Sequence, residues 1–322
     1  MTPIIGRHPA RLTLVVCPSG DPMPASAHLV DVPTLEYYLA VSARSPIALR
    51  LVLGHLLRTL RKDAGIHAET AGRFIRGSEA KISRMERAQV TCKHHDVTDL
   101  LGFYGVEDPQ VLAHFAEMVR MSRQPGWWQR FDGVLPDWAG KLIGLQEAAS
   151  TIRTYEVQLV PGLLQTATYT EAVVRQAYPL APQGEVDERV ELRRIRQDVL
   201  ARQDAPRLWA VLDEAVLRRP MGGEQVMREQ LQHLIKMSQL EHITIQIAPF
   251  NRPGCIAGGF PITHLRFDLP ALPDIVYLEQ LRDAEYLDKP EETQHYRSVL
   301  DSLAHAALSP QDSRDLLEHT LN

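Results

Sequence analysis

Residues 65–87 have the sequence GIHAETAGRFIRGSEAKISRMER, which predicts two short helices joined by a tight turn. Close crossing of two helices needs small side chains on the first, and Ala71 and Gly72 supply them. Gly77 is a conformationally permissive residue for the turn. Ser78 is a good N-cap for the second helix, with Glu79 favourably placed in its first turn. The segment therefore predicts a helix-turn-helix whose second helix covers residues 78–87.

The second helix has one apolar face and one polar face. Ile82 and Met85 are three residues apart and are expected to face the bundle. The other face carries side chains that suit a DNA groove, because Arg and Lys bind guanine edges or phosphates and Ser bonds adaptably. Glu79 has two interpretations. Its carboxylate either accepts a hydrogen bond from N4 of cytosine or serves only as a favourable negative charge in the first turn of the helix. The candidate DNA-contacting residues are Arg76, Ser78, Glu79, Ala80, Lys81, Ser83, Arg84 and Arg87, with Lys81 and Arg84 as the strongest candidates.

The surrounding sequence predicts a small, basic helical bundle. Apolar residues recur at helical spacing in segments near 34–43, 47–62, 68–75 and 94–104, and Gly65 is placed to end the second of these. Between Ile47 and His95 there are ten basic and four acidic residues, a net charge of +6 in a chain of −5. Charge alone fits a solvated helix face as well as it fits a polyanion-binding module.

Beyond residue 125 the pattern changes to mixed strands and helices. Strand-like runs are expected at 150–159, 208–212, 243–248, 262–267 and 275–279. Helices are expected at 111–121, 167–177, 185–203, 224–239 and 290–307, and from Pro310 onward. We therefore predict an N-terminal all-α helix-turn-helix bundle followed by an α+β domain with a largely antiparallel sheet. The predicted boundaries are 1–45 (an extension, partly disordered or helical), 46–108 (the DNA-binding domain), 109–124 (a linker helix) and 125–322 (the regulatory or partner-binding domain).

Residues 78–87 resemble the recognition helix of the XRE (lambda-repressor-like, Cro/C1-type) family, whose pattern is S-x-x-K-I-S-R-[ILM]-E-R. The rest resembles an antitoxin-like subfamily of high-GC Gram-positive bacteria, in which this motif precedes a domain of unknown function. The matching stretches are Trp127-Trp128, YEVQLVPGLLQT at 155–166, YLEQ at 277–280, YLD at 286–288 and ALSP at 307–310.

The resemblance implies a transcriptional regulator that binds double-stranded DNA as a homodimer. It further implies a C-terminal domain that binds a small-molecule effector or a small protein encoded by a neighbouring gene. The alternative is an antitoxin-like protein that sequesters that small partner, with DNA binding serving autoregulation.

Two departures from the family pattern concern DNA binding. Arg76 occupies the turn position usually taken by Gly, Asp or Asn, so we expect the turn to be rebuilt around Gly77. Ala68 stands where many relatives carry a backbone-contacting Gln, so that contact is expected to be missing.

Several other segments contain residue types that are common in functional sites. Cys92-Lys93-His94-His95 lacks a second ligand pair, which favours a surface segment over a metal site. Trp127 and Trp128 suit an exposed recognition element, but more often such residues close a core at a domain junction. The Pro161–Thr166 segment is interpreted as a turn and core leucines rather than a pocket lining. Cys255, in a long loop, has only His264 as a conceivable catalytic partner. We expect no enzyme activity and no cofactor.

Composition bounds the remaining choices. The 322 residues are 44% hydrophobic and 23% charged, which is ordinary for a globular protein of two domains. Three widely spaced cysteines favour a reducing, cytoplasmic location over a disulfide framework. No apolar run is long enough for a membrane span, and Leu12–Val16 is not followed by a convincing signal-peptide cleavage site.

Overall fold

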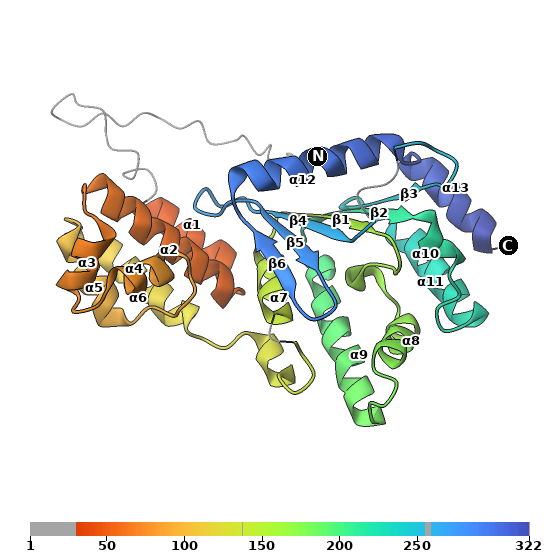
Figure 1. Ribbon diagram of the computed structural model, residues 1–322, viewed down its shortest axis with the longest axis horizontal. Helices are drawn as coiled ribbons and strands as arrows, with labels where there is room; N and C mark the ends of the chain where they lie inside the picture. Colours follow the sequence, from red (N-terminus) through yellow and green to blue (C-terminus); the bar gives the residue numbers. More distant parts are fainter. Residues whose placement is uncertain (1–29, 137, 255–258, 322) are drawn as a thin grey trace, which may run out of the picture.

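A computed structural model describes residues 30–136, 138–254 and 259–321. The helical region comes first and forms a bundle at one end of the molecule (Figure 1). Its elements are α1 (Val32–Ser42), α2 (Pro46–Asp63), α3 (Ala68–Phe74), α4 (Glu79–Glu86), α5 (His94–Phe103), α6 (Pro109–Ser122) and a 3₁₀ helix (Trp127–Phe131). Gly65 ends α2 in the left-handed conformation, with φ 67°, which confirms its expected role. Most of the expected extension, residues 1–29, lies outside the described residues.

The α/β domain follows, with a mixed six-stranded sheet in the order β3-β2-β1-β4-β5-β6. The strands are β1 (Thr151–Glu156), β2 (Arg207–Asp213), β3 (Ile243–Ala248), β4 (Ile262–Arg266), β5 (Ile275–Glu279) and β6 (Ala284–Leu287). The helices are α7 (Ala139–Ala148), α8 (Ala167–Ala177), α9 (Gln183–Gln197), α10 (Glu214–Arg218), α11 (Glu224–Met237), α12 (Pro290–Ala306) and α13 (Pro310–Leu321).

Connection lengths explain the strand directions. Helical crossovers separate β1, β2 and β3, and these strands pair in parallel. From β4 onward no helix intervenes, and β1/β4, β4/β5 and β5/β6 are antiparallel. The predicted fold class, an all-α bundle followed by an α+β domain with a largely antiparallel sheet, is confirmed. Strand β6 and helices α7 and α10 were not predicted from the sequence.

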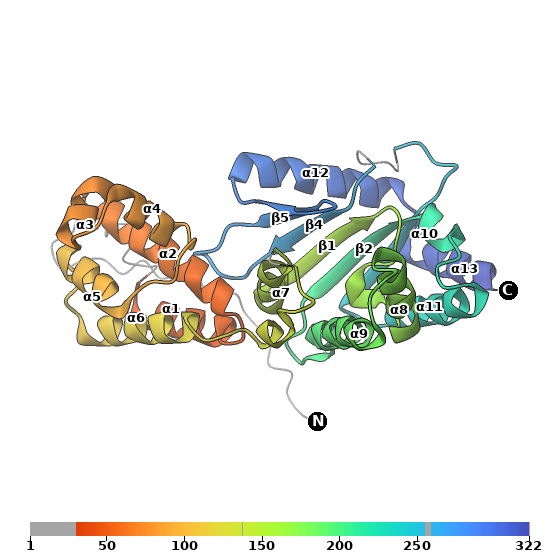
Figure 2. The ribbon, with the colours of Figure 1, turned by 60° about the horizontal axis from the view of Figure 1, so that its bottom comes forward.

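Helices cover both faces of the sheet. The long helix α12 lies on one face, where Leu300 and Leu303 pack with Tyr155 and Val276 of the strands. Helices α7, α8 and α9 lie on the opposite face (Figure 2). Residues of the sheet therefore alternate between an α12 side and an α9 side, as the two-residue period of a strand requires.

The helical region is packed directly on the α/β domain through α7. The Ser45 hydroxyl accepts from Ala48 N at 3.0 Å, capping α2, and donates to the Gly144 carbonyl at 2.5 Å. A Cβ at Gly144 would lie 2.8 Å from Cδ1 of Ile47 and 3.0 Å from the Trp128 ring, so a larger residue would require these side chains to shift. One apolar core runs continuously from Leu35 in α1 to Leu317 in α13.

Candidate nucleic-acid interface

Helices α3 and α4 cross at a contact that only small residues permit. Ala71 is fully buried, and a Cβ added to Gly72 would lie 2.6 Å from the carbonyl carbon of Ser78. Ser78 is the N-cap of α4, and its hydroxyl accepts from the backbone N–H of Lys81 at 3.2 Å. The small residues and the cap therefore act as the sequence predicted.

The turn between these helices differs from expectation. Arg76, not Gly77, takes the left-handed conformation, with φ 52°. Gly77 N donates to Gly72 O at 2.8 Å and Arg76 N to Arg73 O at 3.0 Å, the bonding of a Schellman motif. The expectation of a turn rebuilt around Gly77 is wrong, because the α3 carbonyls are satisfied only when the residue directly after the C-cap turns left-handed.

A second non-glycine residue, Ala88, is left-handed directly after α4, with φ 54°. Ala88 N donates to Met85 O at 3.0 Å, and Gln89 N donates to Arg84 O at 2.9 Å. Within the described residues, Arg76 and Ala88 are the non-glycine positions with positive φ, and they bracket α4. Left-handed backbone costs an L-residue about 1–2 kcal/mol, and such strain concentrates at functional sites.

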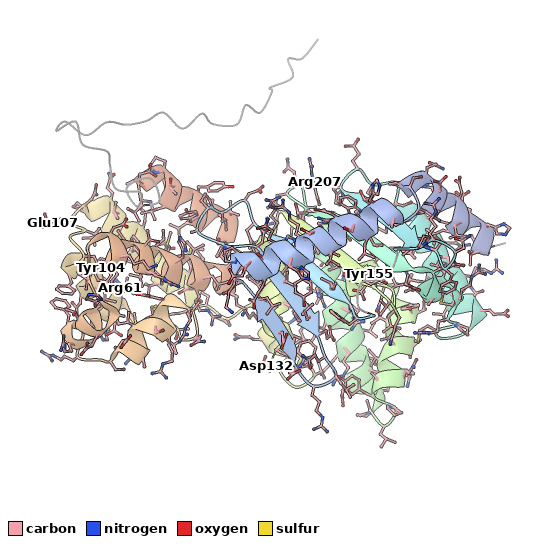
Figure 3. The ribbon with its side chains drawn as sticks, turned by 45° about the horizontal axis from the view of Figure 1, so that its top comes forward. Arg61, Tyr104, Glu107, Asp132, Tyr155 and Arg207 are labelled. Carbon is pink, nitrogen blue, oxygen red and sulfur yellow. The ribbon has the colours of Figure 1, made fainter. Side chains whose placement is uncertain are left out.

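Two ion pairs hold α4 against the bundle. Glu86 forms a bidentate pair with Arg61 of α2, at 2.6 Å to Nε and 3.0 Å to Nη2, and both side chains are mostly buried. The hydrogen bonds that Arg61 donates to Glu86 raise the pKa of its guanidinium. Tyr104 lies beside Arg61 in the bundle (Figure 3), and burial raises the pKa of its hydroxyl. At the other end of α4, Lys81 Nζ lies 2.8 Å from Oδ2 of the buried Asp96.

The structure places most predicted contact residues on one exposed surface. Ile82 and Met85 are buried beneath α4, as predicted. The exposed candidates are Arg76, Ser78, Glu79, Ala80, Arg84 and Arg87, and Ser83 is half-buried. Lys81 is also half-buried, and its ammonium is turned toward Asp96. Three supports of this surface, Arg61, Glu86 and Asp96, were not predicted from the sequence, because nothing in their local spacing shows which helix each residue would contact.

Helices α3, α4 and α5 lie at the end of the helical region that points away from the sheet (Figures 1 and 2). The N-termini of α3 and α4 are therefore not covered by the α/β domain. Arg84 Nε donates to Ala80 O at 3.3 Å and Arg87 Nε to Ser83 O at 3.2 Å, so both arginines lie along the helix surface. This arrangement suits a helix that enters a groove with cations on its flank.

The other sequence candidates have structural roles where the structure describes them. Trp128 is buried and Trp127 Nε1 donates to Glu147 at 2.9 Å, which confirms the junction interpretation. Leu163 and Leu164 are buried in the core, as expected of a structural turn. Cys255 lies outside the described residues.

Cys92 is buried, and burial raises the pKa of its thiol to about 11, which disfavours a metal-binding thiolate. Within residues 30–136, 138–254 and 259–321 no cluster of His, Cys, Asp and Glu is arranged to hold a metal ion. Over the same residues no helix has the length and apolarity to cross a membrane.

Comparison with known protein families identifies both parts of the chain. Residues 52–115 match a helix-turn-helix domain, which indicates a DNA-binding regulator. Residues 139–319 match a domain of unknown function, DUF5753. No curated protein and no solved structure matches the chain. Because the second match covers more than half of the 322 residues, the protein belongs to the family defined by the DUF5753 domain, here preceded by a helix-turn-helix domain.

Proposed function

We propose that the protein is a sequence-specific transcriptional regulator of the XRE, Cro/C1-type class, which binds the major groove as a homodimer through α4. Residues 46–108 form the DNA-binding unit of this proposal, and the α/β domain binds the effector or partner that regulates it. The observation that carries the proposal is the exposed face of α4, which presents Arg84 and Arg87. A mostly buried ion pair (Arg61–Glu86) and a half-buried one (Lys81–Asp96) hold the opposite side of the helix against the bundle.

Arg84 is the proposed base-contacting residue, because it is an exposed cation on α4, in the last turn of the helix. Arg76 and Arg87 stand at the two ends of the helix and suit phosphate contacts, which position a protein without specifying sequence. Lys81 supports α4 through Asp96 in the free protein, so a base contact by Lys81 would require its ammonium to leave that carboxylate.

Footprinting on the region upstream of its own gene tests the proposal. Arg84→Ala should lower specific affinity by about five- to 150-fold, the equivalent of about 1–3 kcal/mol for a base-reading arginine. Arg120→Ala is the matched control, because Arg120 is exposed on α6 and pairs with the neighbouring Glu117. Absence of any footprint at moderate salt, or normal affinity in Arg84→Ala, contradicts the assignment.

The alternative is an antitoxin-like role in which the α/β domain sequesters a small protein encoded nearby. It is favoured by the resemblance noted above and by the acidic remainder of the chain, which carries a net −11 outside residues 47–95. Co-expression with the product of the neighbouring gene tests it. Co-purification of the pair, unaffected by Arg84→Ala, supports the role, and separate elution excludes it for that product.

A further inference from the structure

Helix α9 carries arginines where an amphipathic helix carries apolar residues. Arg189, Arg193 and Arg196 follow the i, i+4, i+7 spacing of a single helix face, and all three are half-buried. Val186 is the only fully buried residue of this helix. The face of α9 that is turned toward the sheet is therefore cationic.

The neighbours of Arg189 supply its guanidinium with a counter-charge and hydrogen-bond partners. It pairs with Glu185, donates to Val134 O at 2.6 Å and stacks on the Tyr178 ring. Arg193 and Arg196 instead bond to amide oxygens, Arg193 to Gln165 at 2.6 Å and Arg196 to Gln146 at 2.7 Å. Among the residues that the structure describes, no carboxylate lies within 4.0 Å of either guanidinium. Two half-buried cations thus lack a direct counter-charge, an arrangement that costs free energy unless a ligand supplies it.

The sheet beneath α9 is polar. Thr154, Thr263, Tyr277 and Tyr286 stand side by side in register across β1, β4, β5 and β6. Two residues further along β1 and β5 are Glu156 and Glu279, on the same face. Thr154 donates to Glu156 at 2.9 Å, and Tyr277 donates to Glu279 at 2.9 Å. We refer to Arg193, Arg196, Glu156, Glu279 and Tyr277 as the α9 cluster.

The charge balance of the α9 cluster favours an anion. Burial, together with the nearby Glu279, raises the pKa of Glu156 to about 8, so this carboxyl is mainly protonated at neutral pH. Burial, and then repulsion by Arg196, lowers the pKa of Arg193 to about 10, which leaves it charged. Two guanidiniums therefore face a carboxyl, Glu156, that is mainly uncharged. Glu279 is exposed and marks where the cluster reaches solvent.

We propose that the α9 cluster is the effector site of this protein, and that it binds a small organic molecule through a carboxylate or phosphate held by Arg193 and Arg196. The two side chains converge on Gly162, where an added Cβ would lie 3.8 Å from both Arg193 Nε and Arg196 Nη1. Paired guanidiniums provide the planar, multidentate donors that carboxylate and phosphate groups prefer. Tyr277 and Glu279 are placed to bond hydroxyl or amine groups elsewhere on the ligand.

The regulatory use of this site rests on the proposed DNA-binding function. Gln146, which bonds Arg196, belongs to α7, and Gly144 of the same helix contacts Ile47 and Ser45 at the start of α2. A ligand that takes Arg196 from Gln146 changes the contacts of α7 on one side. The other side of α7 packs against the helical region. A continuous chain of contacts therefore links the ligand site to the helix-turn-helix, and ligand binding can change the position of the DNA-binding helices through it.

Thermal unfolding of the full chain, with inorganic phosphate or citrate added at constant ionic strength, tests the site. Both probes should raise the melting temperature, since a ligand that binds only the folded state stabilises it. Arg193→Met should weaken the apparent affinity at least about tenfold, whereas Arg194→Met should not change it. Arg194 is the matched control because it is exposed one residue away and pairs with Glu191.

Glu279→Gln provides a test that does not depend on tolerance of a buried substitution. Glu279 is exposed, and glutamine still accepts from Tyr277, so folding should be preserved. Removing the like charge should tighten phosphate binding by about three- to tenfold. No shift with either probe, or the same shift in Arg193→Met as in the unaltered protein (an adventitious anion only), overturns the proposal, as does an unchanged affinity in Glu279→Gln.

Mobility-shift assays separate this inference from the proposed function. If the protein binds the anion but forms no specific DNA complex, the proposed anion site is supported and the proposed function as a DNA-binding regulator is refuted. Specific DNA binding without any anion-dependent stabilisation keeps the regulator and refutes the site.

Discussion

Replacing Glu86 with alanine tests how α4 is held in position. The substitution leaves the Arg61 guanidinium, whose side chain is only 11% exposed, without the carboxylate that it contacts at 2.6 and 3.0 Å. At an effective dielectric constant of about 20, unit charges about 4 Å apart attract by about 4 kcal/mol. Removing one partner of a buried pair costs about 3–5 kcal/mol, because the other charge stays buried. We expect a loss in that range, confined at first to α2, α4 and their neighbours.

Native-state hydrogen exchange of the full chain measures this loss locally. Every 1.4 kcal/mol changes an equilibrium tenfold, so peptides from α4 should exchange roughly a hundredfold to several-thousandfold faster. Peptides from α12 provide an internal control, since that helix packs on the sheet. Glu117→Ala is the matched variant, because its pair with Arg120 is exposed and should contribute at most about 1 kcal/mol.

A double substitution separates the ion pair from simple loss of packing. In Arg61→Met/Glu86→Leu no charge is left buried, and most of the protection of α4 should return. The reasoning is refuted if Glu86→Ala changes the exchange rate in α4 by less than about tenfold. It is also refuted if the loss of protection in the double variant equals the sum of the losses in Arg61→Met and Glu86→Leu alone.

Three further substitutions have defined outcomes. Gly72→Ala should separate α3 from α4 and abolish specific DNA binding in mobility-shift assays, because its Cβ would lie 2.6 Å from Ser78, whereas Gly102→Ala, with open space, should bind DNA normally. Arg76→Gly should raise the melting temperature, since relief of about 1–2 kcal/mol of left-handed strain at φ 52° exceeds the entropic cost of glycine, about 0.5–1 kcal/mol, and a lowered value would contradict the strain. Because the pKa of Glu156 is raised to about 8, the folded protein keeps a proton that the unfolded chain has released. The contribution of this proton to the free energy of unfolding is full below the pKa of the unfolded chain, and it is lost as pH rises through about 8. Chemical denaturation from pH 5 to 9 should show that decline, and Glu156→Gln should flatten it.

The sequence predicted what depends on local physical chemistry. Ser78 caps α4 because a hydroxyl before a helix satisfies its free N–H groups, and Ile82 and Met85 are buried because of their spacing. The spans of β3 and β5, as well as that of α8, were also predicted, since apolar periodicity and flanking breakers define such segments.

What was missed depends on contacts between distant segments. Helix α7 has apolar residues around most of its circumference because it packs on both α2 and the sheet, so it lacks the one-sided pattern that identifies a helix. Asp96 supports Lys81 only once α5 and α4 are side by side. Strand order follows from where the crossover helices pack, and no local pattern encodes that. Arg76 shows the reverse case, in which local preference indicated glycine and the bonding of the turn prevailed.

The continuous core has a consequence for how the chain loses its structure. The Ser45 hydroxyl both caps α2 and bonds to α7. Separating the helical region from the α/β domain therefore breaks a bond of the same hydroxyl that holds the first turn of α2. The apolar cluster crosses the same boundary without interruption. Calorimetry should therefore record one heat-absorption peak rather than two. Limited proteolysis should release neither part as a folded fragment, although family comparison divides the chain there. We therefore expect the cooperative unit of unfolding to be larger than either of the two matched segments, 52–115 and 139–319.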